Sequence, residues 1–113
     1  MVGLDFGTTY SGFSYCHVVN PEEICTYDEW PEGPCYKTNT VLQYDHNNNL
    51  TSWGAPALCK RPSPKRSSHK INDGVELFKL HLGNSLEKPY LPDGLDYKKA
   101  ISDYLREVGK VRV

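Results

Sequence analysis

The sequence lacks the features that mark a membrane, secreted or zinc-organised protein. No apolar run among its 113 residues approaches the ~20 residues that span a bilayer, and no basic stretch followed by an apolar one suggests a secretory signal. Its four cysteines form no CxxC pair and its four histidines no HxxxH pair, so the spacing does not predict a zinc site. With no export signal visible, we expect free thiols and a cytoplasmic location.

The chain also lacks an excess of charge of either sign. Its 13 basic and 14 acidic residues leave a net charge of −1, which gives no general attraction to nucleic acid or to a membrane surface. We expect neither as a partner. At this length, with 38% hydrophobic residues, the chain forms at most one small domain.

One tract departs from this balance. Residues 60–70, KRPSPKRSSHK, hold five lysines and arginines and no acid. A nuclear-import or nucleic-acid patch is one interpretation, but two prolines prevent a continuous basic helix and no aromatic residue lies between the charges. We interpret residues 59–72 as a mobile basic linker within the domain.

The first fifteen residues, MVGLDFGTTYSGFSY, have the pattern of a strand, a tight turn and a returning strand. Gly7 permits close approach of the backbone to another group, and successive turn amides form a concavity suited to an anion. An acid such as Asp5, just before the turn, is unusual in a core strand unless it faces a cation or an ordered water. A carboxylate beside a phosphate cradle suits a magnesium–nucleotide complex. The alternative is a small hairpin with a polar turn.

Further strands are expected in the first half of the chain. Residues 24–27 predict a third short strand, and residues 28–34 an acidic, proline-punctuated loop that Trp30 pins to the domain. Residues 37–44 alternate in polarity, and residues 50–54 return after an asparagine-rich turn, which predicts a second hairpin.

Short helices are expected after it. The segment 55–60 has Pro56 in its first turn. Asp73 is a candidate N-cap with Glu76 as its box partner, which predicts a second short helix with an apolar face that ends at Gly83. That face consists of Val75, Phe78 and Leu82.

The clearest helix is expected over residues 96–110. Apolar residues recur there at helical spacing and form a continuous stripe, and Lys99 and Asp103 are spaced for an i,i+4 ion pair on the remaining face. The stripe consists of Tyr97, Ala100, Ile101, Tyr104, Leu105 and Val108.

These motifs resemble a known superfamily. Residues 2–9, VGLDFGTT, resemble the first phosphate-binding motif of actin, hexokinase and the seventy-kilodalton heat-shock chaperones, and the continuation YSG is closer to the heat-shock branch. KTNTVL at 37–42 and SWGAPA at 52–57 are similar to a divergent heat-shock-like branch, although Asn39 stands where that branch often has proline. The resemblance implies an α/β fold in which residues 1–113 form the N-terminal portion of an actin-like (ribonuclease H-like) ATPase domain. A mixed β-sheet with hairpins would be followed by two or three helices.

The resemblance also implies binding of Mg-ATP. The segment for the β- and γ-phosphates would be Gly7, Thr8, Thr9 and Tyr10. Asp5 would hold Mg²⁺ through water, and Lys79, on the helix after the second hairpin, would reach the γ-phosphate and the attacking water. A lysine between apolar residues is otherwise usually a surface charge on a buried stem.

Much of the family's nucleotide site would lie outside these residues. Its second phosphate loop, adenosine-contacting segment and peptide-binding domain come from sequence later than Val113. We therefore expect an ATP- or ADP-binding segment of a heat-shock-like chaperone that does not hydrolyse ATP alone. Unfolded polypeptide or a co-chaperone would be its partners in a longer protein. The alternative is a non-enzymatic protein-interaction module that uses the 96–110 helix stripe.

Overall fold

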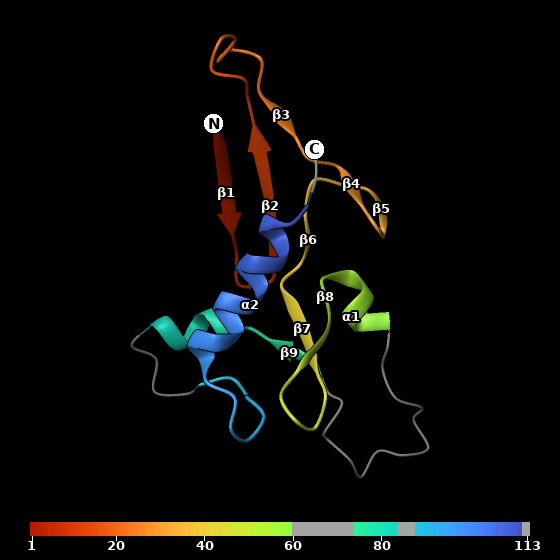
Figure 1. Ribbon diagram of the computed structural model, residues 1–113, viewed down its shortest axis with the longest axis vertical. Helices are drawn as coiled ribbons and strands as arrows, with labels where there is room; N and C mark the ends of the chain where they lie inside the picture. Colours follow the sequence, from red (N-terminus) through yellow and green to blue (C-terminus); the bar gives the residue numbers. More distant parts are fainter. Residues whose placement is uncertain (60–73, 84–87, 112–113) are drawn as a thin grey trace.

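The computed structural model describes residues 1–59, 74–83 and 88–111 (Figure 1). This part of the chain is a mixed α/β structure whose paired strands run antiparallel. The strands are β1 (Val2–Phe6), β2 (Tyr10–Tyr15), β3 (Cys25–Thr26), β4 (Glu29–Trp30), β5 (Gly33–Pro34), β6 (Thr38–Asn39), β7 (Val41–Tyr44), β8 (Leu50–Trp53) and β9 (Val75–Glu76). The helices are α1 (Ala55–Cys59), α2 (Tyr97–Gly109) and a 3₁₀ helix, Phe78–Leu82. Over these ranges, each helix is too short or too polar to cross a membrane.

The first sheet is organised around β2. The whole of β1 pairs with one edge of β2, and β3 and β6 share the opposite edge. The predicted first hairpin and the third short strand are therefore confirmed. Within the described ranges β1 pairs only with β2, and Figure 1 shows it at the margin of the molecule.

The second sheet has the order β8-β7-β9 and contains the predicted second hairpin. The first strand of this hairpin is shorter than the predicted residues 37–44, because Thr40 interrupts the strand. Thr38–Asn39 pairs with β2 of the first sheet, and only Val41–Tyr44 pairs with β8. The backbone N–H of Thr40 donates to the carbonyl oxygen of Thr9, 2.8 Å away. One stretch of chain thus serves both sheets.

The acidic loop contains a small hairpin that the sequence did not predict. β4 pairs with β5, and Trp30 is only 4% exposed. Its ring makes edge contacts with Tyr27 and Trp53, at centroid distances of 4.7 and 6.4 Å. Trp30 therefore attaches the loop to the domain, as expected.

The prediction of a short helix from Asp73 to Gly83 is wrong for its first residues. Asp73 lies outside the described residues, and Val75–Glu76 is strand β9, which pairs with Val41 and Leu42 of β7. Leu77 then takes a left-handed backbone, with φ of 56°, and the 3₁₀ helix follows. Val75 and Phe78 are buried as expected, whereas Leu82 is 61% exposed.

The predicted basic linker at 59–72 also lies outside the described residues, except that Cys59 ends α1. The helix expected over 55–60 is confirmed as Ala55–Cys59.

Helix α2 is confirmed, and half of its stripe lies in the core, whereas Tyr97, Ile101 and Leu105 are half-buried. Ala100 and Tyr104 are fully buried, and Val108 is 7% exposed. They contribute to a cluster that includes Phe13, Leu42, Val75, Phe78 and Leu95. In Figure 1 the helix lies beside the junction of the two sheets.

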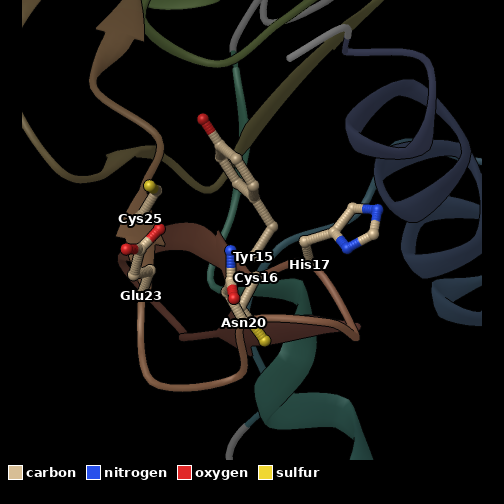
Figure 2. A pocket seen from close by; sticks show the side chains of 6 residues that line it. All are labelled: Tyr15, Cys16, His17, Asn20, Glu23 and Cys25. Carbon is tan, nitrogen blue, oxygen red and sulfur yellow. The ribbon is translucent and has the colours of Figure 1, made fainter.

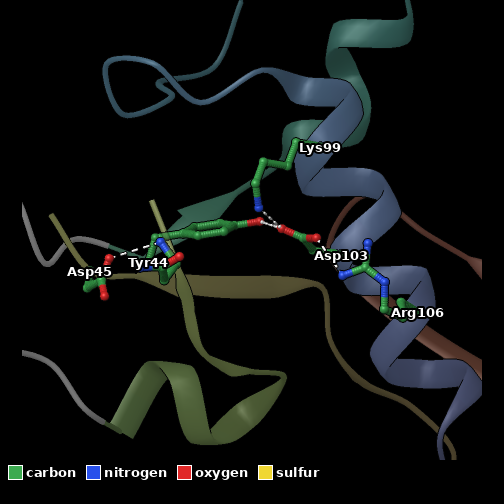
Figure 3. Close-up of polar contacts among 6 residues, drawn as sticks. Tyr44, Asp45, Lys99, Asp103 and Arg106 are labelled. Carbon is green, nitrogen blue, oxygen red and sulfur yellow. Dashed lines mark hydrogen bonds and ion pairs between the residues drawn. The ribbon is translucent and has the colours of Figure 1, made fainter. Parts of the chain in front are cut away.

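Asp103 is the exception to the expected helix pattern, because it is buried rather than on the polar face. It is 3% exposed, and its carboxylate accepts hydrogen bonds from Tyr44, Lys99 and Arg106 at 2.7, 2.7 and 2.9 Å (Figure 3). The expected Lys99–Asp103 pair is present. This network connects α2 to β7.

Candidate functional site

The candidate site is the turn between β1 and β2. Phe6 and Ser11 are the last β1–β2 pair, so Gly7 to Tyr10 close the hairpin, with Tyr10 also the first residue of β2. A methyl group on Gly7 would lie 2.2 Å from the carbonyl oxygen of Tyr10, so the turn is too tight for any side chain at this position. Thr8 is half-buried, whereas Thr9 and Tyr10 are exposed.

Buried polar groups on the core side of the turn hold it in place. Ser11 Oγ and Thr40 Oγ1 lie 2.6 Å apart, and the hydroxyl of Tyr104 donates to the carbonyl oxygen of Asn39 at 3.0 Å. Burial raises the pKa of Tyr104, so its phenol stays protonated and able to donate. The Phe6 ring also stacks on that of Tyr104, with centroids 5.9 Å apart. Buried side chains therefore support the turn on its core side.

Asp5 points to solvent beside the turn and pairs with Lys37. Lys37 Nζ lies 2.6 Å from Asp5 Oδ2, and the two side chains are 51% and 63% exposed. The hydrogen bond from Lys37, together with its charge, holds the pKa of Asp5 below its usual value.

A glycine makes this ion pair possible. Gly12 is the partner of Asp5 in the β1–β2 register, and a methyl group on it would lie 3.3 Å from Cγ of Lys37 and 2.5 Å from the carbonyl oxygen of Tyr36. Because Gly12 has no side chain, the Lys37 stem can pass across β2 to reach Asp5 on β1.

Lys79 reaches the same place from the 3₁₀ helix that follows β9. Its Nζ donates to the carbonyl oxygen of Phe6, 73 positions away in the sequence, and lies 5.2 Å from the centroid of the Phe6 ring. The preceding residue, Phe78, is fully buried and holds the 3₁₀ helix in place. The charge of Lys79 contributes to the lowered pKa of Asp5. The structure thus brings Asp5, the turn and Lys79 together.

Lys37 is the residue of this site that sequence reasoning missed. A lysine near the start of an alternating strand has no distinguishing pattern. The only available signal was Gly12, and its meaning depends on the register that places it opposite Asp5.

The residues of this site fit a magnesium ion only if phosphate oxygens supply further ligands. No cluster of three His, Cys, Asp or Glu side chains in the described ranges could hold a metal ion. Mg²⁺ typically keeps several waters and binds through one or two carboxylates together with substrate phosphates. Asp5 is one exposed carboxylate of this kind, and Lys37 pairs with one of its two oxygens.

A cavity at the far end of the first hairpin gathers other reactive side chains. Its volume is about 320 Å³, and it is lined by Tyr15, Cys16, His17, Asn20, Glu23 and Cys25 (Figure 2). Nδ1 of His17 accepts the backbone N–H of Val19 at 3.1 Å. Figure 2 shows the imidazole and the two thiols pointing in different directions. No nucleophile–base pair is formed there.

Comparison with known proteins gives no assignment: no family model, curated protein or solved structure matches this chain.

Proposed function

We propose that the chain binds the β- and γ-phosphates of Mg-ATP at the Gly7–Tyr10 turn, as part of an actin-like, heat-shock-like ATPase domain. The contact between Lys79 Nζ and the Phe6 carbonyl oxygen is the observation that supports this most. It places an ammonium group at the mouth of a tight turn, next to a solvent-facing carboxylate. Anion, cation and turn amides would then meet at one point.

Each group has a distinct role in this proposal. The turn amides and the hydroxyls of Thr8 and Thr9 donate to phosphate oxygens, because Gly7 leaves the backbone accessible. Lys79 supplies a charge-assisted hydrogen bond to the terminal phosphate. Asp5 orients waters of the metal. Bound Mg²⁺ would supply neutralisation of the phosphate charge.

Hydrolysis by this chain alone is not part of the proposal. Phosphoryl transfer needs an oriented water and donors on several sides of the phosphate, in a site that excludes bulk water. The turn offers donors on one side, and Asp5 is 63% exposed. We propose that turnover, and any action on unfolded polypeptide or with a co-chaperone, requires further protein.

The interaction-module alternative would need the α2 stripe to be accessible. The centre of the stripe on α2, Ala100 and Tyr104, is fully buried in the core of this chain.

Titration with Mg-ATP tests the proposal. We expect saturable binding to the wild-type chain by calorimetry and a loss of about ten-fold or more in affinity for an Asp5→Asn, Thr8→Ala double variant, because charge-assisted contacts are lost. An unchanged Mg-ATP affinity of the double variant would contradict the proposal. A Lys79→Met variant should also bind more weakly. Lys88→Met is its matched control, because Lys88 is exposed and donates to another backbone carbonyl, that of Gly83.

A further inference from the structure

Lys37 is a second lysine at the turn, and no sequence motif indicates a role for it. Its ammonium group pairs with the carboxylate that the proposed function gives to the magnesium ion. Mg²⁺ and an ammonium group compete for the same oxygens. Charge repulsion from the hydrated ion also acts on the ammonium group, so we expect occupation of the site by Mg-ATP to weaken the Lys37–Asp5 pair.

The main chain at Lys37 is held on both sides. Thr38 pairs with Ser11, and its hydroxyl donates to a carboxylate oxygen of Glu32 at 3.0 Å. The carbonyl oxygen of Lys37 itself accepts the thiol of Cys35 at 3.2 Å. The stem of Lys37 therefore starts from a fixed point beside β2.

The charged end of Lys37, by contrast, is held in an exposed ion pair. The side chain is half-exposed and its ammonium group sits on a flexible four-carbon stem. Ion pairs between exposed groups are weak in water, so little opposes a change of partner. A doubly charged cation at Asp5 favours the change, and a nearby phosphate offers a new acceptor.

We propose that Lys37 is a reserve phosphate ligand: it neutralises Asp5 in the empty site and moves to the phosphates when hydrated Mg²⁺ neutralises Asp5 in its place. This inference rests on the proposed function at the same turn. It adds a specificity: the metal-bound triphosphate recruits two lysines, Lys37 and Lys79, whereas the metal-free nucleotide leaves Lys37 on Asp5.

A double-mutant comparison separates this role from a purely structural one. Mg-ATP affinity is measured by calorimetry for the wild type, Lys37→Met, Asp5→Asn and the double variant. We expect Lys37→Met to weaken binding about ten-fold in both backgrounds, and Lys37→Arg to retain most of the affinity. If Lys37 serves only to hold Asp5, its removal from the Asp5→Asn chain has no effect, and the inference is overturned.

A spectroscopic readout follows the exchange directly. The carboxyl ¹³C signal of Asp5 reports its pKa, which should rise in Lys37→Met because the hydrogen bond and the nearby charge are gone. In the wild type, saturating Mg-ATP should shift the ¹⁵N signal of the Lys37 ammonium, and metal-free ATP should leave it in place. A signal that does not move with Mg-ATP contradicts the exchange.

The control distinguishes the two proposals. Lys110 is an exposed lysine that forms an ion pair with Glu107, at 3.0 Å, so Lys110→Met removes a surface charge without touching the turn. Wild-type binding together with equal affinities for Lys37→Met and Lys110→Met overturns this inference alone. Absence of Mg-ATP binding by the wild type overturns the proposed function, and this inference with it.

Discussion

Asp103 is a carboxylate with almost no exposure to water, and its three donors explain how it remains charged. Burial alone would raise its pKa, but hydrogen bonds from Lys99, Tyr44 and Arg106 together hold the pKa below its usual value. Burial and the bond to Asp103 raise the pKa of Tyr44 in turn, so the phenol remains a donor. A buried charge of this kind is tolerated only when its partners satisfy it.

This network should make the protein sensitive to acid. Because the pKa of folded Asp103 is below its unfolded value, its contribution is complete above about pH 4 and is lost as the pH falls through the folded pKa. We expect Asp103→Asn to lower the free energy of unfolding at pH 7 by about 2 kcal/mol and to lose less stability on acidification than the wild type. Urea unfolding at pH 7 and pH 3 measures both effects.

Glu107→Gln is the matched control, since Glu107 lies on the same helix, is 23% exposed and pairs with the exposed Lys110. Parallel loss of stability by the wild type and Asp103→Asn on acidification would show that other carboxylates dominate the acid response.

Local sequence was enough to identify some residues of the candidate site and not others. Asp5 and the Gly7–Tyr10 turn belong to one short motif, and Lys79 was singled out through a resemblance. The Lys37–Asp5 contact joins residues 32 positions apart, and the Tyr44–Asp103 contact joins residues 59 positions apart. No local sequence pattern encodes either contact. The nucleotide roles of these residues remain proposals.

At the scale of elements, the first hairpin depends on the closeness of its turn. A methyl group on Gly7 would meet a backbone oxygen that cannot swing aside, whereas one on Gly3 has nothing within 4 Å. We expect Gly7→Ala to lower the free energy of unfolding by about 1–3 kcal/mol, the typical cost of overpacking, and Gly3→Ala to change it far less. Thermal unfolding of both variants checks this, and equal stabilities would show that the turn can open without cost.

Which elements could be predicted also follows from the range of their contacts. The two hairpins and α2 have local signals, namely turn residues and helical periodicity. Val75–Glu76 is a strand because β7 offers an edge more than thirty positions earlier in the chain. The division of residues 37–44 at Thr40 likewise comes from the pairing of Thr38–Asn39 with β2.

At the scale of the whole molecule, α2 joins the two sheets. The ring of Tyr104 lies against Phe6 of the first sheet and Trp53 of the second, with centroids 5.9 and 5.7 Å away. The residues beside the candidate turn therefore share one core with the second hairpin. The far end of the first hairpin lies away from this core (Figure 1), and Val18, Val19 and Ile24 are exposed there.

The outer edge of β1 has a consequence for amide hydrogen exchange. Met1 and Cys16 exchange both backbone hydrogen bonds, each 3.0 Å long. Because bonding alternates along an antiparallel ladder, the N–H groups of Gly3 and Asp5 point towards β2. The N–H groups of Leu4 and Phe6 point outward. We expect alternating protection along β1, slow at Gly3 and Asp5 and fast at Leu4 and Phe6, in deuterium exchange followed by NMR. The amides of Val41 and Leu42, where β7 is bonded to β9 on one side and to residues 53–54 on the other, serve as the reference for protection from both sides. Uniformly slow exchange along β1 would instead mean that another strand covers this edge in solution.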